Sequence, residues 1–345
     1  MNIKKQFISR FAGAVLLAAP ALAALSSCGS VFDDLDPCPR GISLRFVYDY
    51  NMEKANAFPS QVDCLTLHIY DADGNFVATH TETTDALSDE GYRMTIDLPA
   101  GDYHAVAYGG IECQDASFAH NVPPVSGTRY TDIAMAIKPA HIGTRLHDLF
   151  HGAIDFTVEE GLDYSQATVR MMKDTNHFRI MLQHMSYDPV DGKDFEFKIV
   201  DDNTLFAHDN SLLDNGETTY TAWTVGQVST GHVPAEIQGN KAHAADNPVE
   251  VKVGYAELST SRLHLMRNPR LIIYSHEKQR NIVELPLNNY LTLSKSDADD
   301  MGDQEYLDRQ SRWNMLFFLD RDHLWLKTNI VVNDWRVRIN DIDDF

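Results

Sequence analysis

The amino-acid sequence predicts an all-β protein made of two antiparallel β-sandwich domains in tandem. Apolar and polar residues alternate with period two in many short segments, as in strands that bury one face. Stretches rich in glycine, proline and aspartate separate these segments and are typical of turns. Removing the N-terminal leader described below, the first 27 of 345 residues, leaves 318, more than one hydrophobic core usually serves.

The first set of strands lies between residues 41 and 145. Ile42, Leu44 and Phe46 fall on one face of the first strand, with polar residues between them. Segments 71–75 and 99–102 have the composition of tight turns. We expect strands at 42–50, 62–70, 76–80, 92–98, 103–108 and 130–137.

A second and longer set begins after residue 145. A polar segment, 201–247, interrupts it, and a short helix is expected at 303–312 after an acidic loop. The expected strands are 153–158, 167–171, 177–185, 195–200, 250–255, 270–275, 282–285, 315–319, 326–332 and 337–339. Because about 200 residues are many for one sandwich, this half is expected to carry loop insertions. We therefore assign a leader, a tether and two sandwiches: 1–27, 28–40, 41–145 and 146–345.

The N-terminus has the pattern of a bacterial lipoprotein signal. Three basic residues, Lys4, Lys5 and Arg10, precede an apolar run at 11–24, which is too short to span a bilayer. Leucine and two serines then lead directly to Cys28, followed by glycine, serine and an acidic stretch. We expect the Cys28 thiol to carry diacylglycerol and its freed amine a further acyl chain, since several chains anchor a protein firmly. The alternative is an ordinary cleaved signal with an incidental cysteine.

The charge of the chain excludes some partners. The net charge is −21, and loss of the leader with its three positive charges brings it to −24. Such a chain is repelled by nucleic-acid phosphates and by anionic headgroups. Membrane attachment is therefore expected to come from lipid and not from a basic patch, and no second apolar run approaches the ~20 residues that cross a bilayer.

Three cysteines remain once Cys28 is assigned to lipid. An odd number in an oxidising compartment favours one disulfide and one spare thiol. Cys38 precedes the first strand and Cys113 follows a later one, so both lie at strand ends where loops can meet. We predict a Cys38–Cys113 disulfide and a free Cys64. The chain lacks a CxxC pair, so a catalytic or metal-binding role of these cysteines is disfavoured.

Motifs that would indicate metal binding or catalysis have structural explanations. His147 and His151 have the spacing of a zinc-protease helix, but aspartate replaces glutamate and Gly152 with strand-like residues follows. A connector with polar side chains explains them better. The acidic segments 71–74 and 297–303 have some calcium-site character, yet a hairpin turn and a helix start account for them. We expect no metal, no cofactor and no enzymatic activity, since nucleophile-elbow, Walker and dinucleotide motifs are absent.

Several segments together resemble one protein family. They keep their order along nearly the whole chain and follow the lipoprotein signal: 36–41, 44–52, 61–63, 70–74, 98–103, 146–152, 303–310, 313–314, 317–320 and 335–342. The chain resembles the FimB-type fimbrial anchor and minor-subunit lipoproteins of the Bacteroidetes type V pilus system.

This resemblance implies transthyretin-like sandwiches and a lipoprotein exposed on the outer membrane as part of a fimbrium. The implied role is to hold the fimbrial shaft to the cell and to limit or terminate its growth. Shaft and accessory subunits would join by strand exchange, with main-chain bonds at a sheet edge. The strand at 326–332 and the segment after it are the candidates for exchange, or else are ordinary internal strands.

Two other functions stay open from the sequence. One is a surface lipoprotein that binds a host glycan or protein through loops at the ends of its sandwiches. The other is a surface hydrolase that uses His147 and His151 with a metal.

Overall fold

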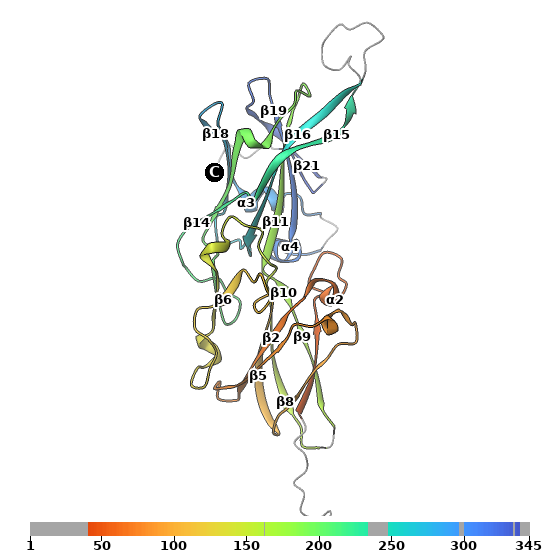
Figure 1. Cartoon of the computed structure of the whole chain (residues 1–345), viewed down its shortest axis with the longest axis vertical. Coiled ribbons are helices and arrows are strands. Elements are labelled where there is room, and N and C mark those ends of the chain that lie inside the picture. Colours follow the sequence, from red (N-terminus) through yellow and green to blue (C-terminus); the bar gives the residue numbers. More distant parts are fainter. Residues whose placement is uncertain (1–40, 162, 234–247, 297–299, 334, 339–345) are drawn as a thin grey trace, which may run out of the picture.

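The computed structural model describes residues 41–338, apart from 162, 234–247, 297–299 and 334, and shows an elongated molecule of two lobes (Figure 1). We refer to the lobe built from β1–β5 and β8–β10 as the N-terminal lobe, and to the lobe built from β11 onward as the C-terminal lobe. The all-β prediction is confirmed. None of the described helices is long and apolar enough to cross a membrane.

The N-terminal lobe is a sandwich of a five-stranded and a three-stranded sheet. The five-stranded sheet has the order β10-β8-β5-β2-β3, with β10 Met172–Lys173, β8 Phe150–Val158, β5 Gly101–Gly109, β2 Leu65–Asp71 and β3 Phe76–Glu82. The other has the order β4-β1-β9, with β4 Met94–Asp97, β1 Gly41–Val47 and β9 Ser165–Arg170. Between them lies a core that includes Leu44, Phe46, Leu67, Ile69 and Phe150. A short helix, α2 Phe58–Gln61, adds buried Phe58 to this core.

The C-terminal lobe is a larger sandwich of six and four strands. The six-stranded sheet has the order β15-β16-β11-β19-β20-β21, with bounds Thr224–Val233, Val249–Ser261, Thr175–His184, Arg312–Leu319, Trp325–Val332 and Trp335–Arg338. The four-stranded sheet has the order β14-β12-β17-β18, with bounds Thr218–Thr221, Phe195–Asp201, Arg270–Ser275 and Arg280–Pro286. Period-two burial in β19 shows why these residues form a strand: Trp313, Met315, Phe317 and Leu319 are buried and Arg312 and Asn314 are exposed. Two helices, α3 Leu287–Thr292 and α4 Asp303–Arg309, follow β18.

A third, small sheet joins the lobes. Its order is β13-β7-β6, with β13 Leu205–Ala207, β7 Ala134–Ile137 and β6 Phe118–His120, so a strand from beyond β12 pairs with one from before β8. Tyr70 and Tyr108 on the five-stranded sheet belong to the same buried cluster as Trp313 of the C-terminal lobe. The outer face of the five-stranded sheet therefore belongs to the apolar core of the C-terminal lobe, whereas the interior of the N-terminal sandwich is a separate cluster.

Four single-turn 3₁₀ helices complete the described elements: η1 Asp85–Ser88, η2 Tyr130–Asp132, η3 Pro139–His141 and η4 Gly192–Asp194.

The predicted domain boundary between residues 145 and 146 is wrong. Strand β8 pairs with β5 from Gly101↔Val158 to Gly109↔Phe150, and β9 lies parallel to β1. Strands within 150–173 thus complete the first sandwich, because hydrophobic alternation identifies a strand but not the sheet that it joins.

Other local expectations changed less. The polar segment 201–247 contains β13, β14 and β15, and α3 was not expected. Two strand pairs, β1 with β9 and β11 with β19, are parallel in an otherwise antiparallel arrangement. Residues 130–132, expected to begin a strand, form a 3₁₀ turn, and the strand starts at Ala134.

Candidate functional site

The residues predicted to tether the protein precede the described part of the chain. Cys28 and Cys38 lie outside the described residues, as does the whole leader. The lipid-attachment prediction therefore rests on the sequence pattern alone.

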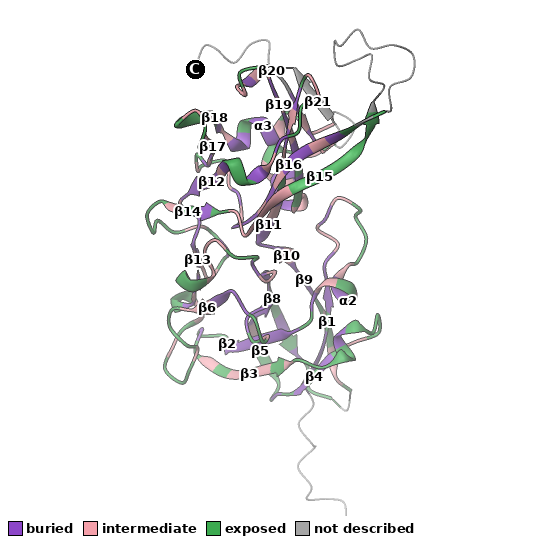
Figure 2. Cartoon of the chain, turned by 45° about the horizontal axis from the view of Figure 1, so that its top comes forward, coloured by how far each residue is buried: buried purple, intermediate pink, exposed green. Residues whose placement is uncertain are grey.

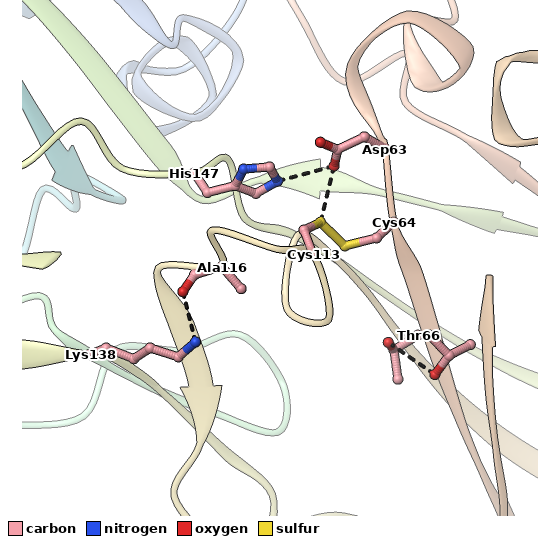
Figure 3. The surroundings of a disulfide bond; sticks show 8 residues. Asp63, Cys64, Thr66, Cys113, Ala116, Lys138 and His147 are labelled. Carbon is pink, nitrogen blue, oxygen red and sulfur yellow. Dashed lines mark hydrogen bonds and ion pairs between the residues drawn. A yellow bond between two sulfur atoms is a disulfide. The ribbon is translucent and has the colours of Figure 1, made fainter. Parts of the chain in front are cut away.

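The disulfide joins Cys64 to Cys113 and not Cys38 to Cys113, so the predicted pairing is wrong (Figure 3). Cys64 directly precedes β2 and Cys113 follows β5, which is the antiparallel neighbour of β2. The pairing Leu65↔Gly109 brings these two strand ends together, and the Cα atoms of the cysteines lie 5.6 Å apart. Sequence spacing could not reveal this, because the bond depends on the order of strands in the sheet.

The disulfide lies beside His147 and Asp63. The Asp63 Oδ1 atom is 3.0 Å from His147 Nε2 and 3.1 Å from Cys113 Sγ (Figure 3). These three residues have the spacing of metal ligands. A sulfur in a disulfide is not a thiolate, however, so only one imidazole and one exposed carboxylate remain for a metal.

The two histidines of the zinc-like motif do not converge. His147 lies in the loop before β8, whereas His151 is buried within β8 and its Nε2 lies 3.3 Å from the carbonyl oxygen of His208. Residues 145–149 have no helical structure, so the one-turn spacing that a zinc helix needs is not formed. The connector interpretation agrees with this geometry.

The acidic turn at 71–74 closes a hairpin, as predicted. The Asp71 carboxylate accepts hydrogen bonds from the backbone N–H groups of Asp73 and Asn75 and from the Asn75 side chain. Gly74 has a φ of 81°, which glycine adopts without strain. At the second acidic segment, residues 297–299 lie outside the described part, and Asp303 pairs with Lys295.

The C-terminal strand is an internal strand of its own sheet. β20 pairs with β19 on one side and with β21 on the other, so its main-chain groups are already used. This bears out the alternative of ordinary internal strands for 326–332. Strand β21 lies at the outer edge.

The longest open edge among the described strands is β15, which sequence reasoning missed. Its ten residues pair only with β16, and the side chains of residues 228–232 are exposed, with Val228 at 44% (Figure 2). The strand contains no proline, lysine or acidic residue, the usual protections of an edge, and has one bulge between Ser229 and Gly231. Sequence reasoning missed this strand because its glycines and polar residues resemble the rest of the polar segment 201–247.

The chain is similar to several proteins of known structure. A crystal structure of a proposed adhesin from Bacteroides thetaiotaomicron is 47% identical, with 89% of this chain and 100% of that chain covered and a TM-score of 0.80. A proposed polysaccharide-binding protein from the same organism is 29% identical, with 87% and 98% covered and a TM-score of 0.72. The fimbrial anchor protein Mfa2 from Porphyromonas gingivalis, 16% identical over 87% and 99% with a TM-score of 0.63, shares the fold.

Among proteins with curated descriptions, none matches this chain. The model of the family described as fimbrillin-A associated anchor proteins Mfa1 and Mfa2 matches residues 35–341. That match confirms the predicted resemblance to fimbrial anchor proteins. The chain belongs to the Mfa2 family of fimbrillin-A associated anchor proteins.

Proposed function

We propose that this protein is a lipid-anchored fimbrial subunit that attaches the fimbrial shaft to the outer membrane and limits or terminates its assembly. The single observation that carries the proposal is the family match over residues 35–341. The lipoprotein signal that ends at Cys28 adds the means of attachment. The role is structural and adhesive, not enzymatic.

The placement of the two ends supports this role. Ile42 pairs with Ser165 and Val47 with Arg170, and β9 leads through β10 into the C-terminal lobe, so β1 begins at the end farthest from that lobe. Figure 2 shows β1 and β4 in the lower lobe and the β15–β16 hairpin in the upper lobe. A tether that precedes residue 41 and a partner on β15 would therefore act at opposite ends.

Strand addition at β15 is the mode of assembly that we propose. A partner strand would bond to the unpaired main-chain groups of β15, and its alternate side chains would set the register. A Cβ atom at Gly231 would meet nothing within 4 Å, so this part of the edge leaves room for a neighbour.

The anchoring role is tested by Cys28→Ala in cells that assemble fimbriae. We expect radiolabelled palmitate on the wild type and none on the variant, with fimbriae released into the medium. A serine-to-alanine change at Ser30, just after the expected cleavage site, is the matched control and should leave labelling and attachment unchanged. Fimbriae of normal length that stay on cells carrying Cys28→Ala would contradict the role.

A second candidate function is a surface adhesin that binds a host glycan or protein. The 47% identical relative, described as a proposed adhesin, favours it. A binding screen against host glycans and matrix proteins, beside co-purification with fimbrial subunits, separates the two functions. Binding to host molecules without capture of fimbrial subunits would favour the adhesin.

A further inference from the structure

A hollow of about 400 Å³ lies on the outer face of the six-stranded sheet, close to the junction of the lobes. Its floor is formed by β11, β16 and β19. In β11, Phe178 and Ile180 point into the core, which directs His177 and Arg179 to the outer face. Arg145, from the loop before β8, and Trp223, directly before β15, line its sides.

The carboxylates of the hollow are already neutralised. Asp148 lies 2.7 Å from both Lys173 Nζ and His177 Nε2 and accepts a hydrogen bond from Thr175. Burial alone would raise the pKa of the Asp148 carboxyl, but hydrogen bonds from His177 and Lys173 hold it well below its usual range. Glu257 pairs with Arg179. Neither carboxylate is left to repel an anion.

Two arginines in the hollow remain without a counter-charge. Arg145 and Arg312 are exposed, and neither forms an ion pair within the described part of the chain. In a protein of net charge −21, the hollow thus concentrates uncompensated positive charge in one place. Guanidinium groups present a planar fork of donors that matches a carboxylate.

An unpaired indole provides an independent observation. The Trp223 Nε1 atom is buried and has no hydrogen-bond acceptor within the described residues. The Trp223 backbone N–H donates to the Glu257 carbonyl oxygen at 3.0 Å, which fixes this residue beside Arg179 and Glu257. A buried N–H without a partner is unfavourable, and an acceptor oxygen of a ligand would satisfy it.

An extended peptide cannot bind in the hollow by strand addition. β11 is paired along its length with β16 on one side and β19 on the other. Since no main-chain edge is free there, a ligand can be held only by side chains and must present a compact charged group. The Trp223 ring offers an apolar surface for the C–H face of a sugar ring, and the Asn314 side chain offers polar groups for hydroxyls.

We propose that this hollow binds a carboxylated sugar, such as a hexuronate unit of an acidic glycan, with the carboxylate between Arg145 and Arg312. Trp223 directly precedes β15, but the exposed part of that edge, residues 228–232, does not line the hollow. Its occupation does not depend on the anchoring role.

The test uses the purified full-length lipoprotein in detergent and titration calorimetry at low salt. The probes are a galacturonate tetramer, a neutral galactose tetramer of the same linkage and a sulfated oligosaccharide. We expect the galacturonate to bind, the neutral tetramer not to bind, and affinity for galacturonate to fall with added salt because the contacts are charged. Equal binding of the neutral tetramer, binding of the sulfated probe alone, or no binding at all would overturn the proposal.

Variants locate the binding site. Arg145→Gln with Arg312→Gln should weaken galacturonate binding at least tenfold, and Trp223→Phe, which keeps a ring but removes the N–H, should weaken it several-fold. The matched control is Arg45→Gln with Arg93→Gln, two exposed arginines of the N-terminal lobe, which removes the same charge and should stay within twofold of the wild type. Should the glutamine pair fail to fold, Arg145→Lys with Arg312→Lys keeps the charge and loses the planar fork, with weakened binding expected. Unchanged binding in folded arginine variants would contradict the assignment.

Discussion

The two sandwiches of this molecule differ in how their sheets end. In the N-terminal lobe, a disulfide links the ends of two neighbouring strands, and the edge strands have at most seven residues. In the C-terminal lobe, β15 presents a ten-residue edge with exposed side chains at its outer half. An enclosed lobe suits the transmission of force, whereas an open edge suits assembly, since unpaired strands attract further strands.

Among the changes that distinguish the two lobes, loss of the disulfide in the N-terminal lobe should have the largest effect on stability. Replacing both Cys64 and Cys113 by serine should lower the free energy of unfolding by about 4 kcal/mol, because the bond closes a loop of roughly 50 residues. Urea unfolding followed by tryptophan fluorescence measures the change. All four tryptophans lie after residue 222, so a shift of their signal also shows that the lobes unfold together.

Cys38→Ser serves as the control for the pairing. It should leave the unfolding midpoint unchanged, since Cys113 is bonded to Cys64. Equal losses from Cys38→Ser and Cys113→Ser would contradict the disulfide described above.

The junction of the lobes should be the next most sensitive place. Lys173 on β10 has a side chain only 1% exposed and pairs with Asp148, which also contacts His177 on β11. Lys173→Met should lower the free energy of unfolding by about 2–3 kcal/mol. This loss is smaller than that expected for a fully buried ion pair, because the Asp148 side chain is 27% exposed. Lys198→Met, which breaks the exposed pair with Glu196, should change stability by less than about 0.5 kcal/mol in the same urea titration. Equal losses of stability from the two substitutions would contradict the prediction that the ion pair at the junction contributes more than an exposed one.

The lobes should respond to pH in opposite directions. In the N-terminal lobe and the small sheet that joins the lobes, burial lowers the pKa of His68 to about 3 and of His120 to about 4, and their Nε2 atoms lie 2.9 Å apart. The unfolded chain takes up protons on these histidines near pH 6.5 while the folded chain does not. Stability from them is therefore complete above pH 6.5 and falls as the pH decreases, by about 2 kcal/mol for buried His68 at pH 5.

Two buried carboxyls have the reverse effect. Burial raises the pKa values of Asp174 and Asp201 to about 7. Their contribution is complete below the unfolded value of 3.8 and is lost as the pH rises through 7. Hydrogen exchange followed by mass spectrometry at pH 5 and 7.5 should show faster opening around β2 and β6 at pH 5 and around β11 and β12 at pH 7.5. Parallel changes in both regions would contradict this contrast.

The smallest effect on stability is expected at the sheet edges, where the effect on assembly should be large. Val228→Lys on β15 and Val77→Lys on β3 place the same charge at two edge positions of 44% and 42% exposure. Both should shift the free energy of unfolding by less than about 0.5 kcal/mol. Only Val228→Lys should reduce co-purification with fimbrial subunits, because lysine protects an edge against strand addition. Loss of co-purification with Val77→Lys alone would move the assembly edge to the other lobe.

The sequence was informative where a feature depends on neighbouring residues. The hairpin at Asp71–Gly74 and the alternation of β19 follow from local composition, and both are present. The domain boundary and the disulfide depend on which strands are neighbours in a sheet, and alternation has no information about that. The β15 edge was missed because its glycines and polar residues resemble a loop, and Arg145 and Arg312 are brought to one hollow only by the fold.

Mass spectrometry of the N-terminal peptide from protein isolated with outer membranes tests the anchoring account most directly. We predict that the mature chain begins at Cys28 and carries a thioether-linked diacylglycerol with an amide-linked acyl chain. A mature N-terminus at any other residue, or an unmodified Cys28, would show that no lipid holds the protein to the membrane.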